Sequence, residues 1–230
     1  MNWKKSMLAV GLAIGLASPL LFPAPALAQI SGEAAWVQGS KKVRSLKEIR
    51  GEGVVRQKWD MSCGAAALST VLTYDFKDPT PETAIVVWIL HRVDPIRVRS
   101  RGGFSLLDLK HFAEARGYEA EGFSGMTLED LAQERSSVIT PIHAKGLDHF
   151  VVVKGFVNGH VILVDPAFGN MTMRVDQYQK LWKSGIAFVI HPPDAGMLGE
   201  KNLSLASRIV PDETLITRRI GVTAPSNFLY

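Results

Sequence analysis

The sequence predicts an α+β fold in which a helical N-terminal half packs on a C-terminal antiparallel sheet. Residues 63–134 carry apolar side chains at helical spacing, and residues that favour helix N-termini precede the segments. Residues 138–191 are instead rich in β-branched and aromatic residues, and Asn158-Gly159 is typical of a two-residue hairpin turn. Helices followed by hairpin-linked strands indicate an α+β domain.

Four helices are expected in the first half. The first runs from Cys63 to about Tyr74, with Ser62 as its N-cap. The others follow a capping residue or a proline in the first turn. They are expected at residues 80–91, 106–116 and 128–134, introduced by Thr80-Pro81, Ser105 and Thr127 respectively.

Four strands and one short helix are expected in the second half of the sequence. The strands are expected at residues 138–143, 149–157, 160–165 and 186–191, and the helix at residues 175–182. Because the second and third of these strands flank the hairpin turn, they are expected to be antiparallel neighbours.

Residues 1–28 have the features of an export signal peptide. Two lysines precede an apolar stretch at residues 8–22, and Ala26-Leu27-Ala28 supplies the small residues that signal peptidase prefers. Pro19 and Pro23 make this stretch a poor membrane-spanning helix, although an uncleaved anchor is the alternative. We therefore expect an exported, periplasmic protein whose mature form has no membrane span.

The remaining residues, about 200, suffice for one domain with a hydrophobic core. We expect an N-terminal arm at residues 29–53, a single domain at residues 54–191 and an extension at residues 192–230. Removing residues 1–28 takes away two lysines and no acidic residue, so the formal net charge falls from +4 to +2. A charge this close to zero gives no support for nucleic-acid binding.

One basic cluster departs from this balance and consists of Arg92, Arg97, Arg99 and Arg101. We interpret it as a solvated loop, as most such runs are. The alternative is a rim that attracts an acidic peptide or a membrane surface.

Cys63 is the only cysteine of the chain, so it can form no internal disulfide. A cysteine before an Ala-rich helix is most often a buried core thiol. However, a helix N-terminus lowers the pKa of a thiol, because its unpaired N–H groups and the helix dipole favour the thiolate. Gly64 is expected to leave space beside the sulfur for a substrate carbonyl. Cys63 is therefore a candidate nucleophile.

His149, Asp165 and Gln57 complete a candidate catalytic set. His149 begins one strand of the predicted hairpin and Asp165 ends the other, so the carboxylate can orient the imidazole. Pro166 then ends the strand. The amide of Gln57, together with the backbone N–H of Cys63, can stabilise an oxyanion. Each residue alone has an ordinary structural explanation, but the combination in this order predicts nucleophilic catalysis.

No metal or cofactor is expected. The histidines lack the His-Glu-x-x-His spacing, and one cysteine cannot build a thiolate zinc site. His143 is an alternative base, but it lacks the hairpin link to Asp165.

The residues from Gln57 to Leu68, with His149 and Asp165-Pro166 downstream, resemble those of the bacteriocin-processing peptidases. These are papain-like cysteine peptidases that cut leader peptides after a double glycine. The resemblance covers roughly residues 50–190 and implies a papain-like fold.

By this resemblance Cys63 is the nucleophile, His149 the base, Asp165 the residue that orients the base and Gln57 the oxyanion residue. One position departs from the pattern: many members have an aspartate directly before the cysteine, where this chain has Ser62.

The resemblance also implies the function of an endopeptidase that cleaves a peptide or protein substrate after a small residue. With its predicted signal peptide, the chain resembles the stand-alone exported relatives, some of which accompany functional-amyloid secretion systems. Amyloid or secretion-system subunits are thus the expected partners. Two alternatives remain: a catalytically silent module that binds and chaperones a secreted peptide, and acyl transfer to an acceptor other than water.

Residues 45–51 of the arm, Ser-Leu-Lys-Glu-Ile-Arg-Gly, loosely resemble a double-glycine leader. One hypothesis is that the arm occupies the protein's own substrate groove.

Overall fold

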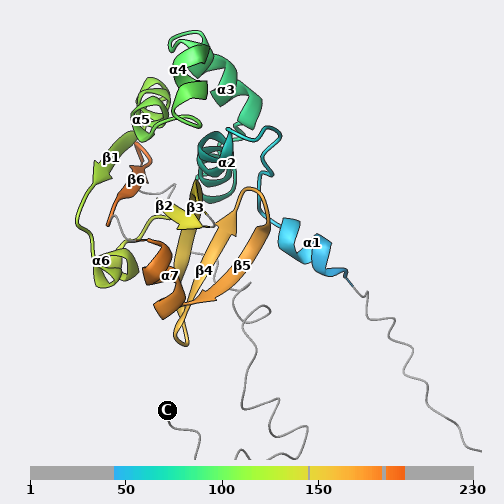
Figure 1. Ribbon diagram of the computed structural model, residues 1–230, viewed down its shortest axis with the longest axis vertical. Helices are drawn as coiled ribbons and strands as arrows, with labels where there is room; N and C mark the ends of the chain where they lie inside the picture. Colours follow the sequence, from blue (N-terminus) through green and yellow to red (C-terminus); the bar gives the residue numbers. More distant parts are fainter. Residues whose placement is uncertain (1–43, 145, 183–184, 195–230) are drawn as a thin grey trace, which may run out of the picture. The chain divides into compact units, whose positions relative to one another are not determined.

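The computed structural model describes residues 44–144, 146–182 and 185–194. Their centre is a six-stranded antiparallel sheet in the order β1-β6-β2-β3-β4-β5, with helices against it (Figure 1). The α+β prediction is therefore confirmed. The predicted signal peptide, and the C-terminal extension from residue 195 onward, lie outside the described residues. In the described part, no helix combines the length and the apolar character that a membrane crossing requires.

The predicted hairpin is present, since β3 and β4 pair in antiparallel fashion. Asn158 and Gly159 in its turn both have positive φ angles, of 48° and 72°. β3 begins at Leu147, two residues before the predicted start, and β1 and β5 were not predicted. The strands are β1 Glu119–Phe123, β2 Val138–Ala144, β3 Leu147–Val157, β4 His160–Asp165, β5 Gly169–Arg174 and β6 Ala187–His191.

Ser105 and Thr127 cap their helices as predicted, and each forms a capping box with an aspartate three residues later. The first predicted helix ends as a π-helical segment, η1, at Val71–Asp75. Two short helices, α1 and α4, were not predicted. The α-helices are α1 Leu46–Gly51, α2 Cys63–Thr70, α3 Glu82–Leu90, α4 Pro95–Ser100, α5 Leu106–Ala115, α6 Leu128–Gln133 and α7 Val175–Leu181.

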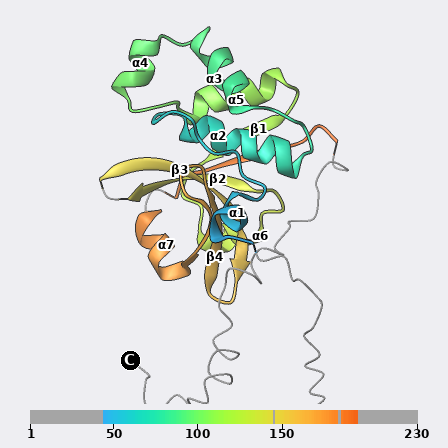
Figure 2. The same cartoon turned by 90° about the vertical axis from the view of Figure 1, so that its right-hand side faces the viewer.

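The sheet is covered on both faces. On one face α2, α3 and α5 build the larger hydrophobic core, and α2 lies directly against β3. On the other face, residues of α6 and α7 such as Leu131 and Tyr178 pack against alternate residues of the same strands. Figures 1 and 2 show α3, α4 and α5 gathered at one end of the described residues. The helical half therefore packs on the sheet as expected, and the later helices add a second layer.

The described part of the predicted N-terminal arm is folded against the sheet. α1 packs on β5, where the buried side chain of Asn170 donates to the carbonyls of Ile49 and Glu52 at 3.3 and 2.7 Å. Gly169 has a φ of +84°, and a Cβ there would lie 2.2 Å from the carbonyl oxygen of Arg50. This close approach requires glycine, and it fixes α1 beside the turn that follows β4.

Candidate active site

Cys63 is the first residue of α2, the helix at the centre of the larger core. Residues 64–70 of this helix are all buried, whereas Cys63 is half-buried at its exposed end. Gly64 has a packing role that the sequence did not reveal. A Cβ there would lie 3.1 Å from Leu109 and 3.2 Å from Phe150, so its missing side chain lets α2 approach α5 and β3. This approach brings β3 beside the sulfur.

Ser62 is the N-cap residue of α2, as predicted. Its hydroxyl makes no capping bond to the first turn. It lies instead 2.8 Å from the carbonyl oxygen of Trp59 and 2.5 Å from the carboxylate of Glu82. The first turn of α2 therefore keeps its backbone N–H groups free of a side-chain cap from Ser62.

His149 and Asp165 form a hydrogen-bonded pair at the mouth of the β3–β4 hairpin. His149 Nε2 lies 2.9 Å from Asp165 Oδ1, and the two side chains are only 20% and 5% exposed. The imidazole of His149 also forms a hydrogen bond with Cys63. The sulfur of Cys63 accepts in addition from the backbone N–H groups of Phe150 and Gly64. The structure thus places the predicted nucleophile, base and orienting carboxylate in one connected group.

These contacts shift the pKa of each of the three side chains in the direction that favours its ionised form. Burial opposes the thiolate of Cys63, but the bond to His149, the charge of His149 and the N–H groups of Phe150 and Gly64 together outweigh burial, so the pKa of the thiol is lowered. Burial likewise opposes the imidazolium, but Asp165 and Cys63 raise the pKa of His149 to about 9. The pKa of Asp165 is lowered despite its burial, because His149 and the N–H groups of Ala167 and Phe168 favour the carboxylate. The arrangement therefore stabilises a thiolate–imidazolium pair.

The turn after β4 connects Asp165 to Gln57. Asp165 Oδ1 accepts the N–H groups of Ala167 and Phe168 at 2.7 and 3.0 Å, and the carbonyl of Pro166 accepts the N–H of Gln57 at 3.0 Å. The turn thereby fixes the carboxylate and holds the start of the loop that leads to Cys63.

Gln57 is held in that loop by its side-chain amide. Its Nε2 donates to the carbonyl of Trp59 at 3.1 Å, while Oε1 is buried and has no hydrogen-bond partner among the described residues. An amide NH₂ carries two hydrogens, so one remains available after the bond to Trp59.

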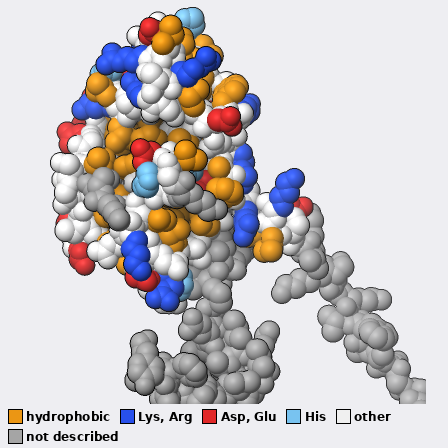
Figure 3. All heavy atoms as spheres, viewed as in Figure 1, with side chains coloured by type: hydrophobic (Ala, Val, Ile, Leu, Met, Phe, Trp, Pro, Cys, Tyr) orange, Lys and Arg blue, Asp and Glu red, His pale blue; other side chains and the backbone are white. Residues whose placement is uncertain are grey.

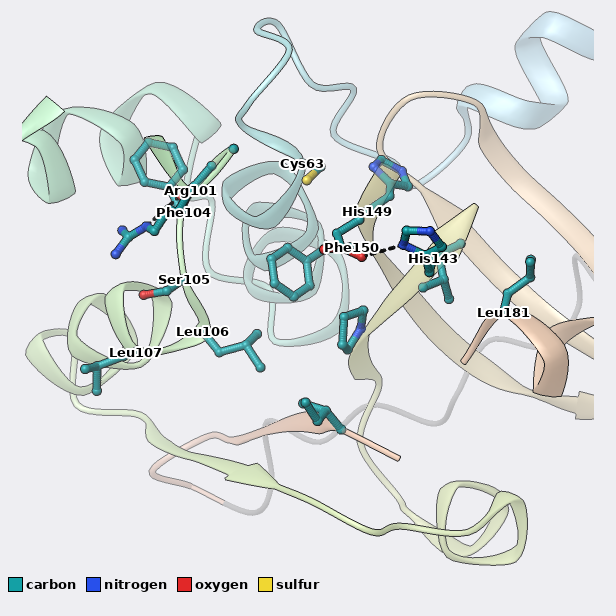
Figure 4. A pocket seen from close by; sticks show the side chains of 16 residues that line it. Cys63, Arg101, Phe104, Ser105, Leu106, Leu107, His143, His149, Phe150 and Leu181 are labelled. Atoms are coloured by element: carbon teal, nitrogen blue, oxygen red, sulfur yellow. Dashed lines mark hydrogen bonds and ion pairs between the residues drawn. The ribbon is translucent and has the colours of Figure 1, made fainter. Parts of the chain in front are cut away.

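A pocket of about 780 Å³ opens beside Cys63. Figure 4 shows His149 and Phe150 on β3 to one side of it and residues 104–107 on the other. Its wall is largely apolar, and Figure 3 shows hydrophobic side chains gathered in the middle of the face seen there. Such a lining favours contact with apolar groups of a bound molecule. Its apolar lining residues are Phe104, Leu106, Leu107, Pro141, Ile142, Phe150, Leu181 and Ile186.

His143, the alternative base, lines the same pocket but belongs to a different pair. Its Nδ1 lies 2.8 Å from Asp148 Oδ1, and the two side chains are 62% and 89% exposed. Among the residues that the structure describes, no cluster of His, Cys, Asp and Glu is suited to hold a metal ion.

The four arginines of the basic cluster are exposed: Arg97 and Arg99 belong to α4, Arg92 precedes it and Arg101 follows it. Arg92 stacks on Trp88 at 3.8 Å from the ring centroid, and Arg101 pairs with Asp108. Only Arg101 of the four lines the pocket beside Cys63.

The sequence model of the peptidase C39 family matches residues 52–195. The chain belongs to this family. The prediction of a papain-like cysteine peptidase is thereby confirmed at the level of the family.

Known proteins similar to the chain agree with this membership. The probable functional amyloid protease FapD of Pseudomonas aeruginosa is 36% identical over 150 residues, which cover 65% of this chain and 65% of that protein. The chain thus matches less than two thirds of this relative's length.

Two solved structures are also similar. The peptidase domain of Streptococcus ComA, a bifunctional ABC transporter, is 21% identical with a TM-score of 0.50 and shares the fold over 60% of this chain and 97% of that domain. A double-glycine-motif protease from an AMS/PCAT transporter, solved with its leader peptide, is 30% identical with a TM-score of 0.49. It covers 60% of this chain and 90% of that one.

Sequence reasoning missed one polar group of this C39 site. The carboxylate of Glu82 is buried behind the loop between Gln57 and Cys63, where it contacts Lys58 and Ser62. The sequence offered one signal, the serine directly before the cysteine where many family members have an aspartate.

Proposed function

We propose that the chain is an exported cysteine endopeptidase that cleaves a secreted or leader-bearing partner after a small residue, at a double-glycine type of site. The observation that carries this proposal is the connected group of Cys63, His149 and Asp165, whose contacts lower the pKa of the thiol and raise that of the imidazole to about 9. A thiolate at neutral pH is what nucleophilic attack on a peptide carbonyl requires.

The residues would act in a fixed order. The sulfur of Cys63 attacks the carbonyl carbon, and the carbonyl oxygen becomes an oxyanion that accepts from Gln57 Nε2 and the backbone N–H of Cys63. His149 gives its proton to the leaving amine as the C–N bond breaks, which leaves an acyl-enzyme. His149 then takes a proton from water, the water oxygen attacks the thioester, and the thiolate leaves. Asp165 keeps the imidazole in position throughout.

The apolar pocket supports a substrate with hydrophobic side chains close to the scissile bond. Its position beside Cys63, between Phe150 and residues 104–107, lets a peptide lie in it while its carbonyl reaches the sulfur. We infer that contacts in this pocket, rather than contacts at the scissile bond, supply most of the binding energy, since apolar burial is the largest favourable contribution to peptide binding. Residues 45–51 do not line this pocket, so α1 is not proposed as a plug.

Peptide cleavage tests the activity directly. The chain from residue 29 onward and its Cys63→Ala variant are incubated, in reducing buffer, with peptides that differ only at the two residues before the bond: Gly-Gly, Gly-Ala, Ala-Ala and Leu-Leu. Mass spectrometry should find cleavage after Gly-Gly by the unaltered chain alone. If both proteins bind the peptides and neither cleaves them, the chain is a binding module.

The biological partner is a separate part of the proposal. The likeness to a probable functional amyloid protease supports an amyloid or secretion-system subunit as the substrate in the periplasm. A strain carrying Cys63→Ala should accumulate a subunit of altered length, read by mass spectrometry of exported proteins. Unchanged subunits and unchanged fibres would remove this part and leave the peptidase activity untouched.

A further inference from the structure

Glu82 places a buried carboxylate behind the loop that carries Gln57 and ends at Cys63. Glu82 is only 2% exposed to solvent. Both carboxylate oxygens accept the backbone N–H of Lys58, at 3.1 and 3.2 Å, and one lies 2.5 Å from the hydroxyl of Ser62. The carboxylate therefore contacts the residue after Gln57 and the residue before Cys63.

A chain of hydrogen bonds continues from this carboxylate to the amide of Gln57. The hydroxyl of Ser62 lies 2.8 Å from the carbonyl oxygen of Trp59 and accepts the N–H of Trp59 at 3.3 Å. The same carbonyl accepts from Gln57 Nε2 at 3.1 Å. Every link joins atoms of residues 57–62 to one another or to Glu82, so the carboxylate fixes the loop and the orientation of the amide together.

The fold alone gives no reason for this burial. Glu82 is the first residue of α3, where the helix dipole favours a carboxylate, but an exposed side chain would gain the same interaction. Among the described residues, no Lys, Arg or His forms an ion pair with it. A buried carboxylate is costly unless hydrogen bonds satisfy it, and here the donors all come from the loop beside Cys63.

We propose that Glu82 is a positioning residue for the oxyanion site. It holds residues 57–62 so that the amide of Gln57 and the backbone N–H of Cys63 converge on one oxygen atom. The role in catalysis rests on the proposed function, whereas the hydrogen bonds of Glu82 do not depend on it.

Two substitutions separate hydrogen bonding from charge. Glu82→Met keeps the size of the side chain but leaves the N–H of Lys58 without its acceptor. Glu82→Gln keeps an acceptor for Lys58 and can donate to Ser62, whose hydroxyl then donates to Trp59. Because a donor displaced by about 1 Å can cost roughly 10²-fold in rate, Glu82→Met should lower kcat by about tenfold to 10²-fold with KM within about twofold. Glu82→Gln should stay within about threefold.

A double-mutant cycle shows whether Glu82 acts through Gln57. Gln57→Ala should lower kcat by about 10²-fold or more, and adding Glu82→Met should then have little further effect. The rate at which iodoacetamide alkylates Cys63 serves as the control, because this reaction forms no oxyanion. A purely structural role for Glu82 would slow alkylation, lower the melting temperature and give additive losses in the cycle.

A peptide aldehyde ending in Gly-Gly gives a readout that needs no turnover. The sulfur of Cys63 bonds to the aldehyde carbon, and the oxygen, protonated by His149, occupies the oxyanion site. Glu82→Met should weaken aldehyde inhibition or binding by about tenfold, and Glu82→Gln should not. If the unaltered chain binds the aldehyde but cleaves no peptide, the proposed function fails while Glu82 is still tested.

Ser62→Ala covers the case in which Glu82→Met does not fold. It removes the middle link of the same chain and should weaken aldehyde binding by several-fold, again without effect in the Gln57→Ala background. Normal aldehyde binding by Glu82→Met and by Ser62→Ala, or equal losses in Glu82→Met and Glu82→Gln, would overturn the proposal. Failure of the unaltered chain to bind the aldehyde at all would overturn both proposals.

Discussion

Two His–Asp pairs of nearly equal geometry lie close together in this molecule. His149 and Asp165 are joined at 2.9 Å across β3 and β4, and His143 and Asp148 at 2.8 Å across β2 and β3. Both histidines line the pocket beside Cys63. Distance within the pair therefore does not distinguish a catalytic group from a surface one.

Burial and contacts do distinguish them. Asp165 is 5% exposed and accepts two backbone N–H groups, while Asp148 is 89% exposed. The imidazole of His149 also bonds to Cys63, and its pKa is raised to about 9. Exposed pairs contribute little because water and salt screen them. The pair beside Cys63 is thus set apart by a fixed, partly desolvated carboxylate and by an imidazole that also bonds to the thiol.

The largest expected effect separates the two histidines. His149→Ala should lower kcat/KM for a cleaved peptide by roughly 10³-fold, because it removes the proton acceptor and the partner of the thiolate. His143→Ala should stay within about twofold. Equal losses in the two variants would show that the pairs share the role of base.

The two carboxylates should differ by a smaller factor. Asp165→Asn should lower kcat by about 10²-fold, because the amide can hold the imidazole but does not stabilise its charged form. Asp148→Asn is the matched control and should change kcat by less than about twofold. A large loss in the control would give the surface pair a part in catalysis.

The pH dependence should report the buried pair. kcat/KM should fall in acid as the thiolate is protonated, and the midpoint of this fall should lie below the ordinary thiol pKa of 9.0, since the pKa of Cys63 is lowered. It should fall again near pH 9 as His149 loses its proton. His143→Ala should leave both limbs in place. An alkaline limb that moves in His143→Ala would contradict the assignment.

The smallest effect concerns stability. Asp165→Ala leaves two backbone N–H groups without their acceptor and should cost about 1–3 kcal/mol in the free energy of unfolding, whereas Asp148→Ala should cost less than about 0.5 kcal/mol. The folded-state pKa of Asp165 is lowered, so its ionisation stabilises the fold above the ordinary value of 3.8. That contribution is lost as the pH falls through the lowered pKa. Thermal unfolding at neutral and acidic pH should show the difference between variants shrink in acid.

Local sequence signals predicted part of the fold well. Asn158-Gly159 specified the hairpin that joins His149 to Asp165, and Ser105 and Thr127 specified helix starts. β1 escaped prediction because only one of its five residues is buried, so its pattern does not alternate. α1 owes its place to contacts with Asn170 and Gly169, which lie far away in the sequence.

The same limit applies to the site. The order of Cys63, His149 and Asp165 along the chain was enough to predict which side chains meet. Helix-capping rules placed Ser62 correctly at the N-cap of α2, but they did not reveal that its hydroxyl contacts the buried Glu82 and makes no capping bond. Such an interaction between distant segments depends on tertiary packing, which a local propensity cannot reveal.

The pH dependence of Cys63 alkylation tests the central claim most directly, since the chain has one cysteine and the reaction needs no substrate. The rate with iodoacetamide should titrate with a pKa below the ordinary 9.0 in the unaltered chain and in His143→Ala. In His149→Ala the midpoint should rise. An unaltered chain that titrates as an ordinary thiol, or a His149→Ala variant with an unchanged profile, would contradict the account.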